Sequence, residues 1–135
     1  MQRDRAQVLE TLQRLLANGP VAQAPSREAD LQVLLALAGA RFAPGRPYTE
    51  REVNAVLRPW LAAFCAPGGF DHVTLRRALV DARFLMRNKA GSTYEARMES
   101  VGETIADDAK DVDPAVVLER IRQDRDNRKR ERTRG

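Results

Sequence analysis

Residues 71–97, DHVTLRRALVDARFLMRNKAGSTYEAR, constrain the fold most, because a helical pattern changes there directly into an extended one. Asp71 is a typical helix N-cap, and the apolar residues that follow it fall on one helical face, at positions 75, 78, 79 and 82. Two short extended runs then flank Lys89-Ala90-Gly91, which is the composition of a β-hairpin with a bulged or longer loop. We therefore predict a helix over residues 72–83 and a two-stranded wing over residues 84–97.

Two further helices are predicted near the start of the chain. Apolar residues recur at three- and four-residue spacing in residues 4–17, and Asn18-Gly19-Pro20 ends that pattern. Ser26 is predicted to cap a second helix, which stops at Gly39. Its apolar stripe indicates that this helix belongs to the core.

The sequence GRPYTEREVNAVLRP contains the clearest helix start in the chain. Thr49 followed by Glu52 is a capping box, in which two backbone amides that begin a helix each gain a side-chain acceptor. We predict a helix over residues 49–58. Pro59 disfavours a helical conformation at the residue before it, so the helix is expected to break or kink there.

The order helix, helix, helix, hairpin is that of the winged-helix arrangement. We therefore expect a mainly α fold with a small β-hairpin, built as a winged helix-turn-helix core with helical extensions at both ends. The expected divisions are an N-terminal helix and linker over residues 1–26, the winged-helix-like domain over 27–97, and an acidic segment with a basic C-terminal helix or tail over 98–135.

The segments FAPGRPYTEREVNAVL and DHVTLRRALVDARFLMRNKAGSTYEAR also resemble a known family. They are similar to the bacterial domain-of-unknown-function family 2087, which occurs in short proteins and in proteins assigned to transcription regulation. The resemblance covers about residues 31–97. It implies a winged-helix-like domain with a regulatory role on nucleic acid.

Charge is distributed unevenly along the chain. Residues 41–97 carry ten basic and five acidic groups, residues 98–118 carry six carboxylates and one lysine, and residues 119–135 carry eight basic and four acidic groups. An acidic segment thus separates two basic ones. This alternation favours an anionic partner for the basic parts, but it would also allow the charges to pair within the molecule.

Double-stranded DNA is the partner that the predicted helix and wing suit best. Arginine bonds guanine through two donors, and basic residues of a wing neutralise phosphates. Arg76 and Arg77 are expected to point away from the core, opposite the apolar stripe. The candidate contacts are His72, Thr74, Arg76, Arg77, Arg83, Arg87, Lys89 and Arg97.

The same helix leaves an alternative open. Val73, Val80 and Phe84 are expected on the side opposite the apolar stripe, between the two arginines, and a helix exposed to DNA would not carry that apolar surface. A protein-protein interaction module on a winged-helix scaffold, without DNA binding, is therefore the second hypothesis. A homodimer is expected, because winged-helix regulators commonly bind paired half-sites.

An enzyme is the least favoured class. The chain has one histidine and one cysteine, His72 and Cys65, and no motif that would organise a nucleophile, a base or a phosphate site. No cofactor and no metal are expected, and Cys65 is interpreted as a small buried hydrophobe. The charged N-terminus lacks the apolar stretch of a signal peptide, which predicts a cytoplasmic protein.

Asp113 before Pro114 is predicted to cap a last helix, which becomes entirely polar after Ile121. Pairs of opposite charge four residues apart, such as Asp124 with Arg128, indicate either a solvated helix or a disordered tail. The basic end is a further candidate for nucleic-acid contact.

Overall fold

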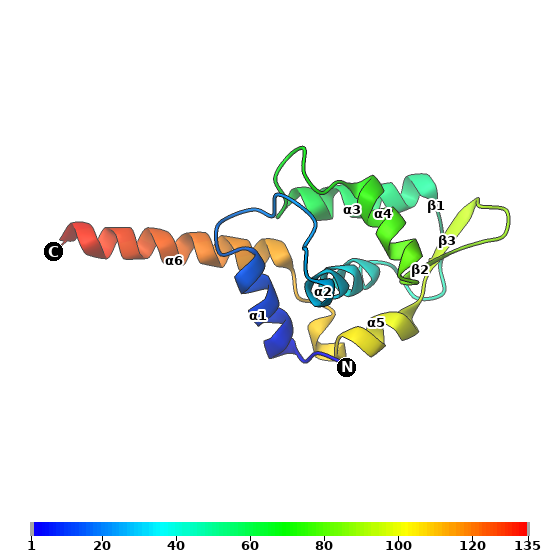
Figure 1. Ribbon diagram of the computed structural model, residues 1–135, viewed down its shortest axis with the longest axis horizontal. Helices are drawn as coiled ribbons and strands as arrows, with labels where there is room; N and C mark the ends of the chain where they lie inside the picture. Colours follow the sequence, from blue (N-terminus) through cyan, green and yellow to red (C-terminus); the bar gives the residue numbers. More distant parts are fainter. Residues whose placement is uncertain (1, 135) are drawn as a thin grey trace.

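The computed structural model describes residues 2–134 and confirms a mainly α fold with a small β-hairpin. In chain order the elements are α1 (Arg5–Leu15), α2 (Glu28–Gly39), β1 (Pro47–Thr49), α3 (Glu50–Ala62), α4 (His72–Asp81), β2 (Leu85–Arg87), β3 (Thr93–Ala96), α5 (Met98–Thr104), the 3-10 turn η1 (Asp107–Ala109) and α6 (Pro114–Arg134) (Figure 1). From α2 to β3 the order is helix, strand, helix, helix, hairpin, so the three helices and the hairpin of the predicted order are present, with the strand β1 in addition.

Side-chain caps begin helices α1, α3 and α4. Asp4 and Thr49 each form a capping box at the start of α1 and α3, and Asp71 accepts the amide of Thr74 at the start of α4. The caps predicted at Thr49 and Asp71 are confirmed. The cap predicted at Ser26 is wrong, because α2 begins one residue later, with Arg27 as an N-cap that forms no side-chain hydrogen bond.

The predicted hairpin is confirmed, and it belongs to a larger sheet. Strand β3 pairs in antiparallel fashion with β2 on one side and with β1 on the other, in the order β1-β3-β2. Tyr48 in β1 lies opposite Tyr94 in β3, and both side chains are buried. Strand β1 directly precedes α3, so this pairing fixes the start of α3 beside the hairpin.

The core surrounds α2. Its residues from Val33 to Gly39 are all buried, so this helix is covered on all sides rather than along one stripe. Gly39 permits the closest of these contacts, because a Cβ there would lie 3.0 Å from Val101 of α5. Leu75 and Leu79 of α4 and Val8 and Leu12 of α1 complete the packing.

Of the break or kink predicted at Pro59, the break is wrong, because α3 continues to Ala62 with the proline inside it. Leu57 and Leu61, on either side of the proline, are buried, and Phe64 beyond the helix is also buried. Their burial keeps the chain helical against the local preference of the residue before proline. Cys65 follows as a buried residue, as predicted, and burial raises the pKa of its thiol to about 11.

The loop from α3 to α4 is held by the linker that precedes α2. Val21 forms backbone hydrogen bonds with Phe64 and Ala66. A Cβ at Gly69 would lie 1.9 Å from the carbonyl oxygen of Ala22, so only glycine fits at this crossing. These contacts fix where α4 begins.

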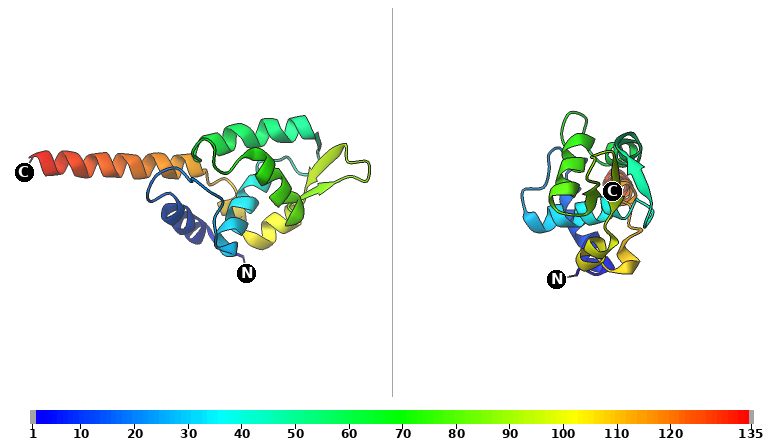
Figure 2. Two further views of the ribbon diagram at one scale, coloured as in Figure 1. Left: turned by 45° about the horizontal axis from the view of Figure 1, so that its top comes forward. Right: turned by 90° about the vertical axis from the view of Figure 1, so that its right-hand side faces the viewer.

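The two ends of the chain pack on the same core. Arg3 pairs with Ile105 after α5, and Asp113 caps α6 by accepting the amide of Ala115, as predicted. Helix α6 docks through Leu118 and Ile121 and then projects beyond the body as a single helix, at the end of the molecule opposite the hairpin (Figures 1 and 2). Of the two predicted states of the tail, the helix is confirmed.

Candidate nucleic-acid interface

Helix α4 is fixed by one face and exposed on the other. Leu75 and Leu79 are fully buried, as the apolar stripe predicts. Thr74, Arg77 and Asp81 follow each other at three- and four-residue spacing and are exposed, so they form one solvent-facing stripe. The helix thus offers a polar surface that the core holds in place.

Arg76 does not lie on that surface, and the prediction that it points away from the protein is wrong. Its side chain is only 13% exposed. One Nη atom donates to Oδ1 of Asn54 at 2.6 Å, and the other lies 3.3 Å from the Glu50 carboxylate. Both partners belong to α3, so Arg76 holds α4 against α3. Its predicted role as a nucleic-acid contact stays a prediction.

A groove of about 380 Å³ lies between α4 and the hairpin. It brings together three of the predicted contact residues, Arg76 and Arg77 from α4 and Arg87 from β2. The complete lining is Glu50, Arg76, Arg77, Val80, Asp81, Arg87 and Tyr94. Side chains from α3, α4, β2 and β3 therefore meet at one concave surface.

The charges in this groove are partly compensated. Glu50 lies beside Arg76 and also accepts a long hydrogen bond from the Tyr94 hydroxyl at 3.5 Å, which leaves its charge committed to the protein. Arg77 forms no ion pair with any residue in 2–134. Arg87 has its guanidinium 5.7 Å from the centre of the Tyr94 ring, with its donors 3.4 Å from the carbonyl oxygen of Gly91. Arg77 and Arg87 are the cations available to a ligand, with Asp81 opposing them.

The N-terminus of α4 is already occupied by a carboxylate. Accepting the backbone amide of Thr74 at 2.8 Å lowers the pKa of Asp71. An ionised carboxylate there satisfies the helix dipole. The start of α4 is therefore not a phosphate site, and any phosphate contact has to come from side chains.

The other predicted contacts lie around the groove rather than in it. Lys89 is exposed in the hairpin loop, and Arg83 is exposed in a left-handed conformation, with φ of 65°, where the chain turns from α4 into β2. His72 is half-buried and lines a separate hollow with Arg58 and the loop before α4. Arg97 lies at the base of the hairpin, 3.7 Å from Glu99, and lines the opposite side of the hairpin.

Sequence reasoning did not identify Glu50 and Asn54 as partners of Arg76. They are four residues apart on α3, so they share one helical face, and both stand next to positions on the buried stripe that begins at Val53. A polar residue at the edge of an apolar stripe is the signal that could have indicated a side-chain partner on another helix. Tyr94, which also lines the groove, is buried.

The apolar residues that supported an interaction module are largely covered within the chain. Phe84 is only 2% exposed and packs near Gly39, and Val80 packs against the core. Val73 stays half-buried. The chain thus satisfies most of this surface without a partner.

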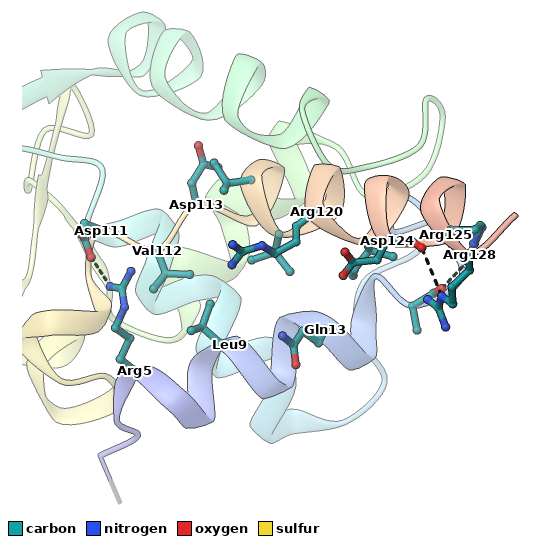
Figure 3. Close-up of a pocket in the computed structure, with 14 residues that line it drawn as sticks. Arg5, Leu9, Gln13, Asp111, Val112, Asp113, Arg120, Asp124, Arg125 and Arg128 are labelled. Atoms are coloured by element: carbon teal, nitrogen blue, oxygen red, sulfur yellow. Dashed lines mark hydrogen bonds and ion pairs between the residues drawn. The ribbon is translucent and has the colours of Figure 1, made fainter. Parts of the chain in front are cut away.

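A larger groove, of about 540 Å³, lies between α1 and α6 (Figure 3). Its apolar part includes Leu9 of α1, Val112 just before α6, and Val116, Val117 and Ile121 of α6. Arg5 crosses one end and bonds Asp111 at 2.7 Å, while Arg125 closes the other end by donating to the carbonyl oxygen of Ala17 at 2.9 Å. None of the eight contact residues predicted on α4 and the hairpin lines this groove, whereas Arg120, Arg125 and Arg128 of the basic C-terminal helix do.

Within residues 2–134, no group of three or more histidine, cysteine, aspartate or glutamate side chains is arranged to hold a metal ion. None of the helices in this range is long and apolar enough to cross a membrane.

Comparison with protein families matches residues 20–96 to an uncharacterised protein conserved in bacteria, the domain-of-unknown-function family 2087. The match covers more than half of the chain and runs from the linker before α2 to the end of β3. The chain belongs to this family. The match confirms the resemblance predicted from the capping box and the helix-hairpin segment, and it includes α3, α4 and the hairpin that form the groove. Neither curated proteins nor solved structures gave a match.

Proposed function

We propose that this member of family 2087 is a transcriptional regulator that binds double-stranded DNA through α4 and the β2–β3 hairpin. The observation that carries the proposal is the shared groove, in which Arg77 of the helix and Arg87 of the hairpin line one surface. In a winged helix-turn-helix, the second helix of the motif enters the major groove and the hairpin follows the backbone. The arrangement of α3, α4 and the hairpin fits that mode of binding.

The size and orientation of α4 suit the major groove. Ten residues make a helix of about 15 Å, close to the roughly 12 Å width of the major groove. Its exposed stripe presents Thr74 and Arg77, side chains that bond base edges or phosphates. Asp81 on the same stripe repels phosphate, which favours contact through the N-terminal half of the helix.

In this proposal, the hairpin supplies the contacts to the phosphate backbone of the DNA. Arg87 and Lys89 are exposed cations on β2 and in the loop that follows it. Arg76 has a positioning role, because its bonds to α3 hold α4 at a fixed angle while Arg77 reaches outward.

The alternative is a protein-interaction module. One observation favours it, which is that Met86 on the hairpin is 54% exposed and lines the surface opposite the groove. The apolar side of α4 no longer supports it, since Val80 and Phe84 pack within the chain.

Binding of the chain to labelled duplex DNA of mixed sequence, at low and moderate salt, tests the proposal. We expect binding at low salt that weakens as salt rises, and a further loss for Arg77→Ala. Arg27→Ala is the matched control, because Arg27 is also exposed and lies outside the lining of the groove. No binding at low salt, or equal losses for the two variants, would favour the interaction module.

A further inference from the structure

We propose that the projecting part of α6, residues 122–134, is a second nucleic-acid contact that binds phosphates flanking the segment held by α4 and the hairpin. The proposal rests on the proposed function, which supplies the primary contact. It concerns a surface that is separate from the α4 groove in both sequence and space.

Five of the seven cations of this arm form a stripe. At about 100° per residue, five basic side chains fall within an arc of about 120°, and the carboxylates of the arm fall outside it. The stripe residues are Arg122, Arg125, Arg128, Lys129 and Arg132.

The stripe continues the face by which α6 docks. Leu118 is buried and Ile121 packs on the core, and both lie on the same arc as the basic stripe. Beyond these apolar residues, at the end of α1, this face of α6 carries Arg125, which donates a hydrogen bond to the carbonyl oxygen of Ala17. Arg128 lines the groove one turn further along (Figure 3). One face of a single helix thus changes from apolar to cationic at the edge of the protein body.

The composition of the arm decides which kind of partner it fits. Residues 122–134 contain no aliphatic or aromatic side chain. A helix that lies on a membrane, or in the groove of a protein, needs apolar anchors along one face. A phosphate backbone is recognised by charge and hydrogen bonds alone, and arginine is suited to it. Nucleic acid is therefore the partner that this helix fits.

Two carboxylates of the acidic segment are paired with cations outside the arm. Asp111 bonds Arg5 at 2.7 Å and Asp107 bonds Lys110 at 2.7 Å, so these two carboxylates are paired near the start of α6. The arm extends from there in the opposite direction, away from α5 and η1 (Figures 1 and 2). The arm and the hairpin lie at opposite ends of the long axis, so the arm would reach DNA outside the segment that the hairpin touches.

Two double variants test the stripe, each removing two positive charges from α6. Arg128→Gln with Arg132→Gln changes the stripe, whereas Arg120→Gln with Arg130→Gln changes cations outside the arc. Glutamine has nearly the helix propensity of arginine, and helix content by circular dichroism checks that the arm stays folded. The probes are mixed-sequence duplexes of about 12 and about 30 base pairs, roughly one and three turns.

On the longer duplex, the stripe variant should bind several-fold more weakly than the control variant. The slope of its affinity against salt concentration, both on logarithmic scales, should become shallower by about 0.9 for each phosphate that the stripe no longer neutralises. On the shorter duplex, the two variants should bind alike. Equal affinities on the longer duplex would overturn the proposal, because they would leave only the effect of net charge.

The same measurements distinguish a failure of the proposed α4 contact from a failure of the proposed arm contact. If the stripe variant binds DNA more weakly while Arg77→Ala binds like the wild type, the arm contact is supported and the proposed role of α4 is refuted. If Arg77→Ala is weakened and the stripe variant is not, the arm proposal falls alone. If the wild-type chain binds neither duplex at low salt, both fall.

Discussion

Replacing Arg76 by methionine should destabilise the fold rather than weaken a DNA contact directly. The substitution keeps an unbranched apolar stem but removes the donor to Asn54 and the ion pair with Glu50. A hydrogen bond from a charged group contributes about 1.5–3 kcal/mol, whereas an ion pair with a carboxylate as exposed as Glu50 adds less than about 1 kcal/mol. We therefore expect a loss of about 1.5–3 kcal/mol in the free energy of unfolding.

The corresponding change in melting temperature follows from the length of the chain. About 2.1 cal/mol/K per residue over 135 residues gives an unfolding entropy of about 0.28 kcal/mol/K, so Tm should fall by roughly 5–11 °C. Arg77→Met is the matched control on the same helix, and its exposed position predicts a change within about 0.5 kcal/mol. Thermal unfolding followed by circular dichroism measures both. An unchanged Tm for Arg76→Met, with a loss of DNA affinity equal to that of Arg77→Met, would refute the positioning role.

Three other predictions concern the fold and its assembly. The hydrogen bonds from Arg14 lower the pKa of the buried Asp30 carboxyl, so the stability from this pair is present above the ordinary value of 3.8 and is lost as pH falls through the lowered pKa. In urea unfolding, Asp30→Asn should therefore lose less free energy of unfolding between about pH 5 and about pH 2 than the wild type does, and parallel pH curves would contradict this. Gly69→Ala should lower Tm because its Cβ would meet the backbone of Ala22. Gly102→Ala, in open space within α5, should raise the free energy of unfolding by up to about 1 kcal/mol, and equal effects of the two variants would count against the close contact between Gly69 and Ala22. If the chain binds paired half-sites, as we propose, sedimentation should show a dimer at micromolar concentration, and a monomer both free and on DNA would exclude this arrangement.

The parts of the fold that could be predicted depend on neighbouring residues. The caps at Thr49 and Asp71 and the turn after Arg87 are local signals, since each is formed by residues within a few positions of one another. They were sufficient to place two helix starts and the hairpin. The family resemblance rested on the same segments and was confirmed.

The parts that could not be predicted depend on distant residues. Strand β1 is only three residues long and is defined by its pairing with Tyr94 and its neighbours, far along the chain. The helix continues through Pro59 because Leu61 is buried, which a local preference does not reveal.

Arg76 and Arg77 show most clearly what sequence cannot resolve in the candidate site. They are adjacent and chemically identical, and helical periodicity places both outside the apolar stripe of α4. Only the position of α3 decides that one is enclosed and the other exposed. The groove itself depends on the same packing, so the residues that line it could not be predicted from the sequence.

The most direct test of the proposed DNA-binding surface is a titration of the isotope-labelled chain with duplex DNA, followed by the backbone amide signals in NMR spectra. We predict that, outside α6, the largest shifts will fall on Thr74, Arg77, Arg87 and Lys89. Shifts that leave α4 and the hairpin unaffected, or no shifts at low salt, would contradict the assignment of this surface to DNA.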